Sequence, residues 1–410
     1  MKNMNLKIIA LIIATAFSVW CSSCTASRVS HWRKLKATSA TFNVLDYGAK
    51  GDGHADDTKA FEEAWEAACK VEGSTMVVPS GSVFLVKPIS FSGPNCEPNI
   101  VFQLEKITIR GKGVIDGQGS VWWNDSPTSN PTEVMMVEST GRLPTTKPTA
   151  LRFYGSDGVT VTGMTIQNSQ QTHLKFDSCT NIQVFDINLS SPGDSPNTDG
   201  IHLQNSKNVV IFSSTLACGD DCISIQTGCS DIYVHNVNCG PGHGISIGSL
   251  GKENTKACVT NITVRDVNIQ NTLTGVRIKT WQGGSGSVQN IMFSNVQVSG
   301  VETPISIDQY YCDGGRCRNE SSAVAVSGIH YVNIKGTYTK NPIYFACSDS
   351  LPCTGITLDT IQLQSSQNPN NVPFCWEAFG ELKTKTIPPV ECLQRGNPSQ
   401  SKFDSNIVSC

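Results

Sequence analysis

Three aspartates, a histidine and two cationic residues recur at matching offsets from short strands of alternating apolar residues. The set consists of Asp199, Asp220, Asp221, His243, Arg277 and Lys279. Crowded carboxylates repel one another, so one of them keeps a proton at a pH where the others are ionised. Hydrolysis of a glycosidic bond needs this combination: a protonated carboxyl donates to the leaving oxygen while an ionised one activates water. The cations suit a sugar that carries a carboxylate.

The offsets place this set on one strip of surface. Two positions before three strands stand Asp199, Asp221 and His243, with Asp220 adjacent. The middle, outward position of the strands holds His202, Ser224, Ser246 and Arg277, and one residue past them come Gln204, Gln226, Gly248, Lys279 and Asp308. Isolated Asp-Gly or Asp-Asp pairs are usually turn residues. A turn gains nothing from crowding three carboxylates, so the strip favours a site over that reading.

A short sequence pattern, here called the phrase, repeats along the chain and predicts the strands that hold the strip. A Gly, Asn, Asp or Lys precedes an apolar-x-apolar triplet, and from residue 158 the starts differ by 23, 27, 23, 30, 29, 38 and 27 residues. A second triplet follows the phrase, as in 201–203, 223–225, 245–247, 276–278, 305–307 and 343–345. Such periods mark solenoids or propellers, and a propeller needs four strands per blade. We therefore predict an all-β, single-domain right-handed parallel β-helix.

Composition narrows the possible partners. The chain has 410 residues, 16% of them charged, and a formal net charge of −3. These values give no electrostatic footprint for nucleic acid, so no nucleic-acid partner is expected.

The ends of the chain depart from the repeat. Residues 1–26 read as a secretory signal, with Lys2 and Lys7 before an apolar stretch too short to span a bilayer. We predict an extension over 27–41, the β-helix over 42–367 with a capping helix from Asp57 to Lys70, and a Cys-rich capping tail over 368–410. The product would be secreted, with no membrane attachment after signal removal, and monomeric. Sequons begin at Asn124, Asn188, Asn261 and Asn319.

Cysteine usage fits an oxidising compartment. Fifteen of the 17 cysteines remain after signal removal. The expected disulfides are Cys222–Cys239, Cys347–Cys353 and Cys392–Cys410. Cysteines two residues before three repeat starts, Cys179, Cys229 and Cys353, are expected to form a buried ladder at one corner of the coils. No cysteine or histidine spacing matches a zinc site, so neither metal nor cofactor is expected.

Four motifs carry a resemblance to a known family. In order they are Asn197-Thr198-Asp199-Gly200, Gly219-Asp220-Asp221-Cys222, Gly242-His243-Gly244 and Arg277-Ile278-Lys279. The sequence resembles the plant-type polygalacturonases, which are pectin-hydrolysing glycoside hydrolases, from Phe42 to the C-terminus. The resemblance implies a secreted cell-wall enzyme that hydrolyses α-1,4 linkages between galacturonic acids of a pectin chain, with inversion and without a metal.

Carried over by motif, the resemblance also implies roles. Asp220 would be the general acid, Asp199 and Asp221 would activate the water, and His243 would tune the protonation of the acid. Arg277, Lys279, Tyr311 and Asn197 would bind substrate, although Tyr310 could be confused with Tyr311.

One departure leaves alternatives open. Only Gln103-Leu104-Glu105 separates two phrases, 98–102 and 106–109, between which family members carry a further strand region. About one coil is missing there.

The mode of cleavage and the class of function keep alternatives. Residues around Lys279 and Asp308 favour internal, endo cleavage over chain-end, exo cleavage. The other readings are an inactive pectin-binding β-helix and a calcium-dependent pectate lyase, whose carboxylates would ligate Ca²⁺.

Overall fold

The computed structural model describes residues 40–79, 81–87, 96–97, 101–104, 107–123, 147–313, 317–367, 371–396, 398 and 410. The predicted secretory signal, most of the predicted extension and the sequon at Asn124 lie outside these residues. The chain divides into two compact units, one of residues 1–78 with 82–102 and one of 79–81 with 103–410. This division falls at the place where the sequence was predicted to lack a coil.

The first unit holds two small sheets and a helix. Strands β1 (Thr41–Asn43), β3 (Thr75–Val78) and β5 (Val101–Leu104) form one sheet, and β2 (Asp52–Asp56) pairs with β4 (Val83–Leu85). A 3-10 turn, η1, covers Val44–Tyr47, and helix α2 covers Thr58–Cys69.

Helix α2 confirms the predicted helix. Its apolar face is buried through Ala60, Phe61, Ala64 and Ala68. Asp57 stands at the N-cap position, but its side chain makes no capping hydrogen bond. The carboxylate of Asp56 caps the helix instead, because it accepts from the Thr58 amide at 3.1 Å. The prediction that helix α2 caps the solenoid stays a prediction.

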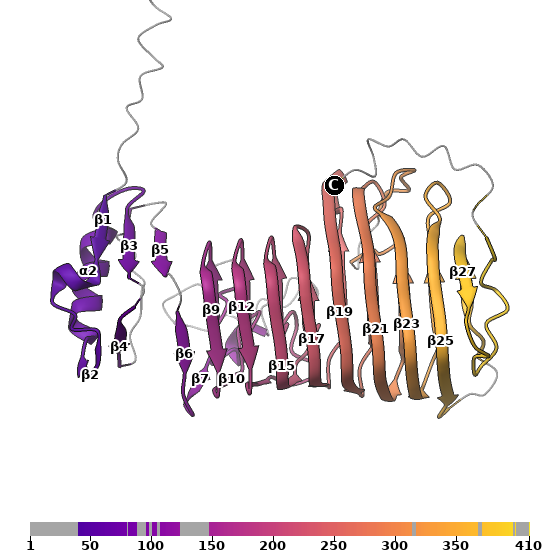
Figure 1. Cartoon of the computed structure of the whole chain (residues 1–410), viewed down its shortest axis with the longest axis horizontal. Coiled ribbons are helices and arrows are strands. Elements are labelled where there is room, and N and C mark those ends of the chain that lie inside the picture. Colours follow the sequence, from indigo (N-terminus) through magenta and orange to yellow (C-terminus); the bar gives the residue numbers. More distant parts are fainter. Residues whose placement is uncertain are drawn as a thin grey trace, which may run out of the picture. The chain divides into compact units, whose positions relative to one another are not determined.

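The second unit is a parallel β-helix built on two parallel sheets, which we call the long sheet and the short sheet. The long sheet has thirteen strands, and its main path runs β27-β25-β23-β21-β19-β17-β15-β12-β9-β6. The short sheet has nine strands in the order β26-β24-β22-β20-β18-β16-β14-β11-β8. From β15 onward each coil adds one strand to each sheet, and Figure 1 shows the labelled strands from β9 to β25 side by side in chain order. The predicted fold class is therefore confirmed.

Strands of the long sheet are short in its first coils and long from β15 to β25. Their bounds are β6 (Thr108–Arg110), β7 (Val114–Asp116), β9 (Asp157–Thr162), β10 (Thr165–Gln167), β12 (Thr180–Phe185), β13 (Asn188–Ser190), β15 (Lys207–Ala217), β17 (Cys229–Cys239), β19 (Lys256–Gln270), β21 (Ser285–Val301), β23 (Ala325–Tyr338), β25 (Cys353–Ser365) and β27 (Ala378–Leu382). Two short helical turns, α3 (Ser120–Trp123) and η2 (Lys252–Asn254), interrupt the coils.

Six of the nine strands of the short sheet, β14, β16, β18, β20, β22 and β24, contain the predicted second triplets. The bounds in this sheet are β8 (Leu151–Tyr154), β11 (Leu174–Asp177), β14 (Ile201–Gln204), β16 (Ile223–Ile225), β18 (Ile245–Leu250), β20 (Thr274–Thr280), β22 (Thr303–Asp308), β24 (Ile343–Ala346) and β26 (Phe374–Trp376). Because side chains alternate between the two faces of a strand, Ile223 and Ile225 point inward, where they stack on Ile245 and Ile247. The residue between them faces outward.

The backbone conformation at the first residue of each repeat phrase explains why Gly, Asn or Asp stands there. Asn181, Asn208, Asp231, Asn261 and Asn290 all adopt a positive φ, between 54° and 59°. Asparagine and aspartate tolerate this left-handed conformation better than other side chains. Their side chains also join between coils: the Asn290 amide donates to Asn261, which donates to Asp231. The turn is thus set identically in successive coils, which keeps them in register.

Six disulfides account for twelve of the fifteen cysteines in the described residues. Two predicted pairs, Cys222–Cys239 and Cys347–Cys353, are confirmed. The predicted Cys392–Cys410 pair is wrong, because Cys392 bonds Cys375 and Cys410 bonds Cys258 on β19. The other disulfides are Cys69–Cys96 and Cys312–Cys317. Cys179, Cys218 and Cys229 are free and buried.

The predicted tail continues the coils before it leaves them. Strand β26 extends the short sheet beyond β24, and β27 extends the long sheet beyond β25. The boundary predicted at residue 368 therefore lies within the last coil rather than after it. Among the described residues, no helix combines the length and apolar character needed to cross a bilayer.

Candidate active site

The turns that lead into β14, β16 and β18 carry the candidate site, as the offsets predicted. Two glycines allow these turns to pass close to their neighbours. A Cβ on Gly219 would lie 1.9 Å from the Ser195 carbonyl oxygen, and one on Gly244 would lie 2.0 Å from the Thr274 carbonyl oxygen. Gly244 also has a φ of +89°. A side chain at either position would push the neighbouring turn away from the strip.

Asp221 lies at the buried centre of the site. Its Oδ1 accepts from Ser246 Oγ at 2.7 Å and from Arg277 Nη2 at 2.8 Å. Its Oδ2 accepts from Lys279 Nζ at 2.9 Å. The side chain is only 3% exposed, and those of Arg277 and Lys279 are 9% and 8% exposed. Both oxygens therefore accept hydrogen bonds, and Arg277 and Lys279, which were predicted to bind substrate, here hold Asp221 in place.

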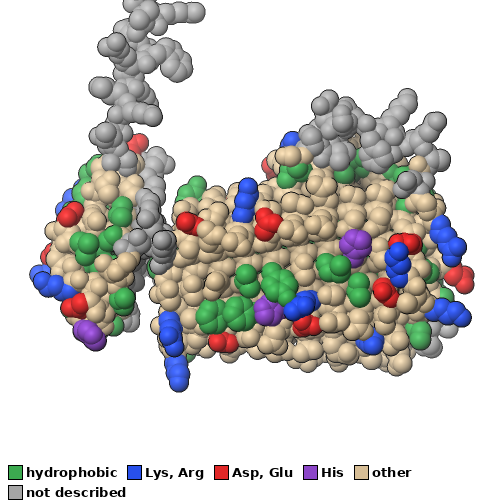
Figure 2. Space-filling model, in the orientation of Figure 1, with side chains coloured by type: hydrophobic (Ala, Val, Ile, Leu, Met, Phe, Trp, Pro, Cys, Tyr) green, Lys and Arg blue, Asp and Glu red, His purple; other side chains and the backbone are tan. Residues whose placement is uncertain are grey.

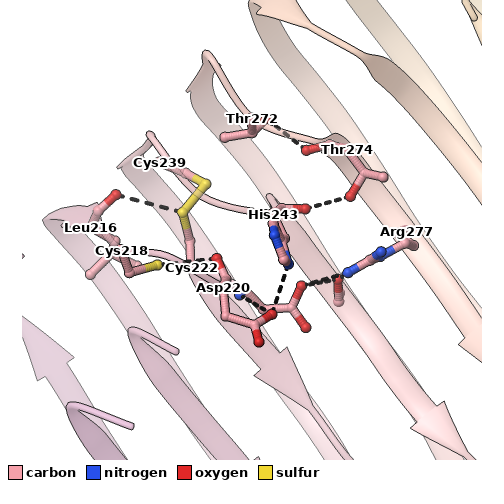
Figure 3. The surroundings of a disulfide bond; sticks show 11 residues. Leu216, Cys218, Asp220, Cys222, Cys239, His243, Thr272, Thr274 and Arg277 are labelled. Carbon is pink, nitrogen blue, oxygen red and sulfur yellow. Dashed lines mark hydrogen bonds and ion pairs between the residues drawn. A yellow bond between two sulfur atoms is a disulfide. The ribbon is translucent and has the colours of Figure 1, made fainter. Parts of the chain in front are cut away.

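Asp220 and His243 form a second pair, nearer the surface. His243 Nδ1 lies 2.9 Å from Asp220 Oδ1, and Figure 3 shows the two side chains turned toward each other. Asn197 Nδ2 donates to the other carboxylate oxygen at 3.3 Å. Burial raises the pKa of Asp220, but the hydrogen bond and charge of His243 and the charge of Lys279 outweigh it and lower that pKa to about 2.

Asp199 and His202 form a third pair, and the offsets placed His202 on the strip without giving it a role. His202 Nδ1 lies 3.2 Å from Asp199 Oδ2, and the side chains are 17% and 14% exposed. Burial, together with the charges of Asp220 and Asp221, raises the pKa of Asp199 to about 6, although His202 opposes the shift. The pKa of Asp199 is thus raised while that of Asp220 is lowered, so the two carboxyls ionise at different pH.

The two candidate tyrosines differ in their surroundings. The hydroxyl of Tyr310 donates to Asp349 at 3.1 Å, so it is engaged elsewhere. The ring of Tyr311 lies 5.2 Å from Lys279 Nζ and packs edge-on against Trp281 at 5.4 Å. Tyr311 is therefore the tyrosine that borders the site, as predicted, and Trp281 is a neighbour that the motifs and offsets did not identify.

A hollow of about 200 Å³ opens beside Arg277, on the side of the acids nearer the C-terminus. It is lined by Leu273, Thr274, Arg277, Glu302, Thr303, Ser306, Asp308, Lys340, Asn341 and Tyr344. Arg277 is shared with the Asp221 cluster, so the hollow continues the strip on which the acids lie.

The Cys222–Cys239 disulfide joins the segments that carry the Asp220–His243 pair. Cys222 follows the double aspartate and Cys239 ends the long strand β17, four residues before His243 (Figure 3). The His243 amide also donates to the Asp220 carbonyl oxygen at 2.7 Å. Two consecutive coils are thus fixed to each other at the site.

Asp220, Asp221 and His243 are the group of described residues whose ligand atoms, all within 4.8 Å of one another, could hold a metal ion. Asp221 already faces two buried cations, Arg277 and Lys279. A further divalent cation beside them would be repelled. The charge arrangement therefore fits an anionic ligand better than a metal ion.

Comparisons with known proteins show the family to which the chain is similar. The profile of the glycosyl hydrolases family 28 matches residues 93–376. A probable polygalacturonase of Arabidopsis thaliana is 39% identical over 382 residues, covering 86% of this chain and 84% of its own length. A polygalacturonase of Malus domestica is 40% identical, covering 81% of this chain and 76% of its own length.

Solved structures support the fold. The polygalacturonase from Erwinia carotovora has a TM-score of 0.57 at 21% identity, covering 85% of this chain and 97% of its own. An exopolygalacturonase from Thermotoga maritima has a TM-score of 0.53 at 22% identity, covering 81% of this chain and 91% of its own. By the family profile and the relatives near 40% identity, this chain belongs to the glycosyl hydrolases family 28.

Proposed function

We propose that the protein is a secreted polygalacturonase, which hydrolyses α-1,4-galacturonosyl linkages within pectin in the plant cell wall and inverts the anomeric centre. The carrying observation is the convergence of Asp199, Asp220 and Asp221 on one strip with two buried cations. The names of the relatives support this substrate. We also propose that residues 1–26 are removed on secretion and that the mature enzyme is a monomer.

In the proposed reaction, the Asp220–His243 pair holds the proton that the leaving oxygen receives. In the open site the lowered pKa of Asp220 keeps its carboxyl ionised beside His243. A bound sugar excludes water, and loss of solvation favours the neutral form of such a pair. Asp220, whose protonation His243 tunes through their hydrogen bond, then donates its proton to the glycosidic oxygen.

Asp199 and Asp221 complete the mechanism as the groups that orient and deprotonate the attacking water. The three hydrogen bonds to Asp221 hold its carboxylate in a fixed orientation. Asp199, with its pKa of about 6, accepts the proton of the water once it is ionised itself. Water bound by these two carboxylates would attack the face of the sugar opposite the leaving group, which is what inversion requires.

Endo cleavage is favoured because the strip continues over coils on both sides of the acids. Outward residues of β11 lie on one side and those of β22 and β24 on the other. A pectin chain could therefore be held on both sides of the broken linkage.

The test uses purified protein and an Asp220→Asn variant, incubated with polygalacturonate and a chelator while viscosity and reducing ends are followed together. A steep fall in viscosity with few new ends, absent in the variant, supports endo hydrolysis. Many ends with a slow fall in viscosity would indicate exo cleavage instead. An unsaturated product that needs calcium would indicate a lyase, and folded protein that binds pectate without releasing ends would be a binding protein.

A further inference from the structure

The outward residues of the short sheet form a column that runs beyond the catalytic acids toward the N-terminal coils. Lys175 on β11 pairs in register with Arg152 on β8 and with His202 on β14. The column then continues through Ser224 and Ser246. Neighbouring strands lie about 4.8 Å apart, so the three basic side chains follow one another at that spacing up to the acids.

The three basic residues differ in whether their charge is already used. Arg152 Nη2 donates to Asp177 at 2.7 Å, and His202 faces Asp199. Within the part of the chain that the structure describes, the ammonium group of Lys175 has no ion pair or hydrogen bond. Lys175 is half-buried and lies close enough to Asp199 to interact with it electrostatically. It is thus a cation held on the floor of the strip, next to the catalytic groups, without an anion of its own.

The surroundings of Lys175 make an added anion favourable. Burial and the charge of Arg152 lower the pKa of Lys175, while Asp177 and Asp199 act in the opposite direction without cancelling the effect. The ammonium ion is therefore less stable here than in water. A carboxylate placed on it would restore the lost stabilisation and form a charge-assisted hydrogen bond.

We propose that Lys175 binds the carboxylate of a galacturonate unit that lies on the side of the catalytic acids nearer the N-terminus. This proposal rests on the proposed function, because it takes the substrate to be a polygalacturonate chain. Arg277 and Lys279 lie on the other side of the acids. Lys175 would select for an unesterified unit at its position, because a methyl ester carries no charge.

The face of the long sheet does not repeat this arrangement. Figure 2 shows basic and acidic side chains scattered over the face seen in Figure 1, where the long sheet lies. Lys335 on β23 is half-buried like Lys175 but is flanked in register by Gln297 and Gln362. It therefore provides a matched control at a position away from the strip.

The experiment compares the wild type with the variants Lys175→Gln, Lys175→Arg and Lys335→Gln. Steady-state kinetics on polygalacturonate give KM and kcat at several salt concentrations, and calorimetric titration with an oligogalacturonate gives the affinity directly. For Lys175→Gln we expect KM to rise about tenfold with kcat nearly kept, which is the loss of one charge-assisted hydrogen bond in a partly exposed site. The affinity should fall by the same factor, and KM should depend less on salt.

Two comparisons separate substrate binding from a structural role. Lys175→Arg should restore most of the affinity, and Lys335→Gln should leave KM and affinity unchanged. On highly methyl-esterified pectin, the difference between the wild type and Lys175→Gln should shrink to less than about twofold, because the charge that Lys175 recognises is gone. Equal melting temperatures of the variants would show that the fold is kept.

An unchanged affinity in Lys175→Gln, or an equal loss in Lys335→Gln, would overturn the proposal. If the wild type releases no ends, the proposed function fails by itself. The titration then still decides the Lys175 proposal: weaker binding of the oligogalacturonate by Lys175→Gln than by Lys335→Gln supports it, and equal binding refutes it.

Discussion

Replacing Asp221 by asparagine should destabilise the β-helix as well as abolish catalysis. Asp221 is the anion that faces two cationic side chains, each less than a tenth exposed. Asparagine keeps the shape and can still accept one hydrogen bond, but it leaves Arg277 and Lys279 as two buried positive charges without the carboxylate that pairs with both of them. Removing one partner of a buried ion pair costs about 3–5 kcal/mol.

That cost corresponds to a measurable change in melting temperature. For a domain of this size, each kcal/mol lowers Tm by about 2 °C, so Asp221→Asn should melt about 6–10 °C below the wild type. Differential scanning calorimetry at one fixed scan rate is the assay, because disulfide-bonded secreted proteins often unfold irreversibly.

Asp266→Asn is the matched control for Asp221→Asn. Asp266 pairs with Arg265, but both side chains are about half exposed, and its φ of 53° suits asparagine. An exposed pair contributes at most about 1 kcal/mol, so Tm should change by less than about 2 °C. A second variant, Asp221→Asn with Lys279→Met, should recover part of the loss, because only one unpaired cation remains. Equal Tm values for Asp221→Asn and the wild type would refute the reasoning.

Three further predictions concern the pH response and the disulfide at the site. His202→Gln should move the acidic limb of the kcat/KM profile to higher pH, because His202 lowers the pKa of Asp199; an unmoved or lower limb would contradict this. Since the folded-state pKa of Asp199 is raised to about 6, its stabilising contribution is complete below about pH 4 and is lost as pH rises through 6. Urea titrations should therefore show Asp199→Asn gaining up to about 3 kcal/mol relative to the wild type between pH 4 and 7, and parallel curves would exclude it. Replacing Cys222 and Cys239 by serine should cost about 3 kcal/mol in the same assay, as expected for a 17-residue loop, whereas a loss below about 1 kcal/mol would assign the bond no stabilising role.

The fold could be predicted because the coil is encoded locally. A positive φ at Asn208, Asp231 and Asn261 needs Asn, Asp or Gly, and the alternation of apolar residues fixes which side chains point inward. Since each coil repeats this pattern, equal offsets in the sequence become equal places on the surface. For the same reason the offsets alone were enough to predict that Asp199, Asp221 and His243 share one strip.

Disulfide pairing shows where such local reasoning ends. Cys222–Cys239 could be predicted because its two ends lie in consecutive turns of the repeat. Cys410 bonds Cys258 across 152 residues, and no offset in the repeat links those positions. Which distant cysteine the tail reaches depends on the path of the tail over the finished coils.

The β-helix, the strip and the residue types on it follow from the order of the amino acids, because strand alternation and the conformation of the turns are local properties. The division of charge along the strip arises only when the coils are stacked. Stacking buries Asp221 between Arg277 and Lys279, leaves the raised pKa on Asp199, and leaves Lys175 without an anion among the described residues. Burial and pairing depend on which side chains from different coils meet, and an offset along the chain does not contain that information.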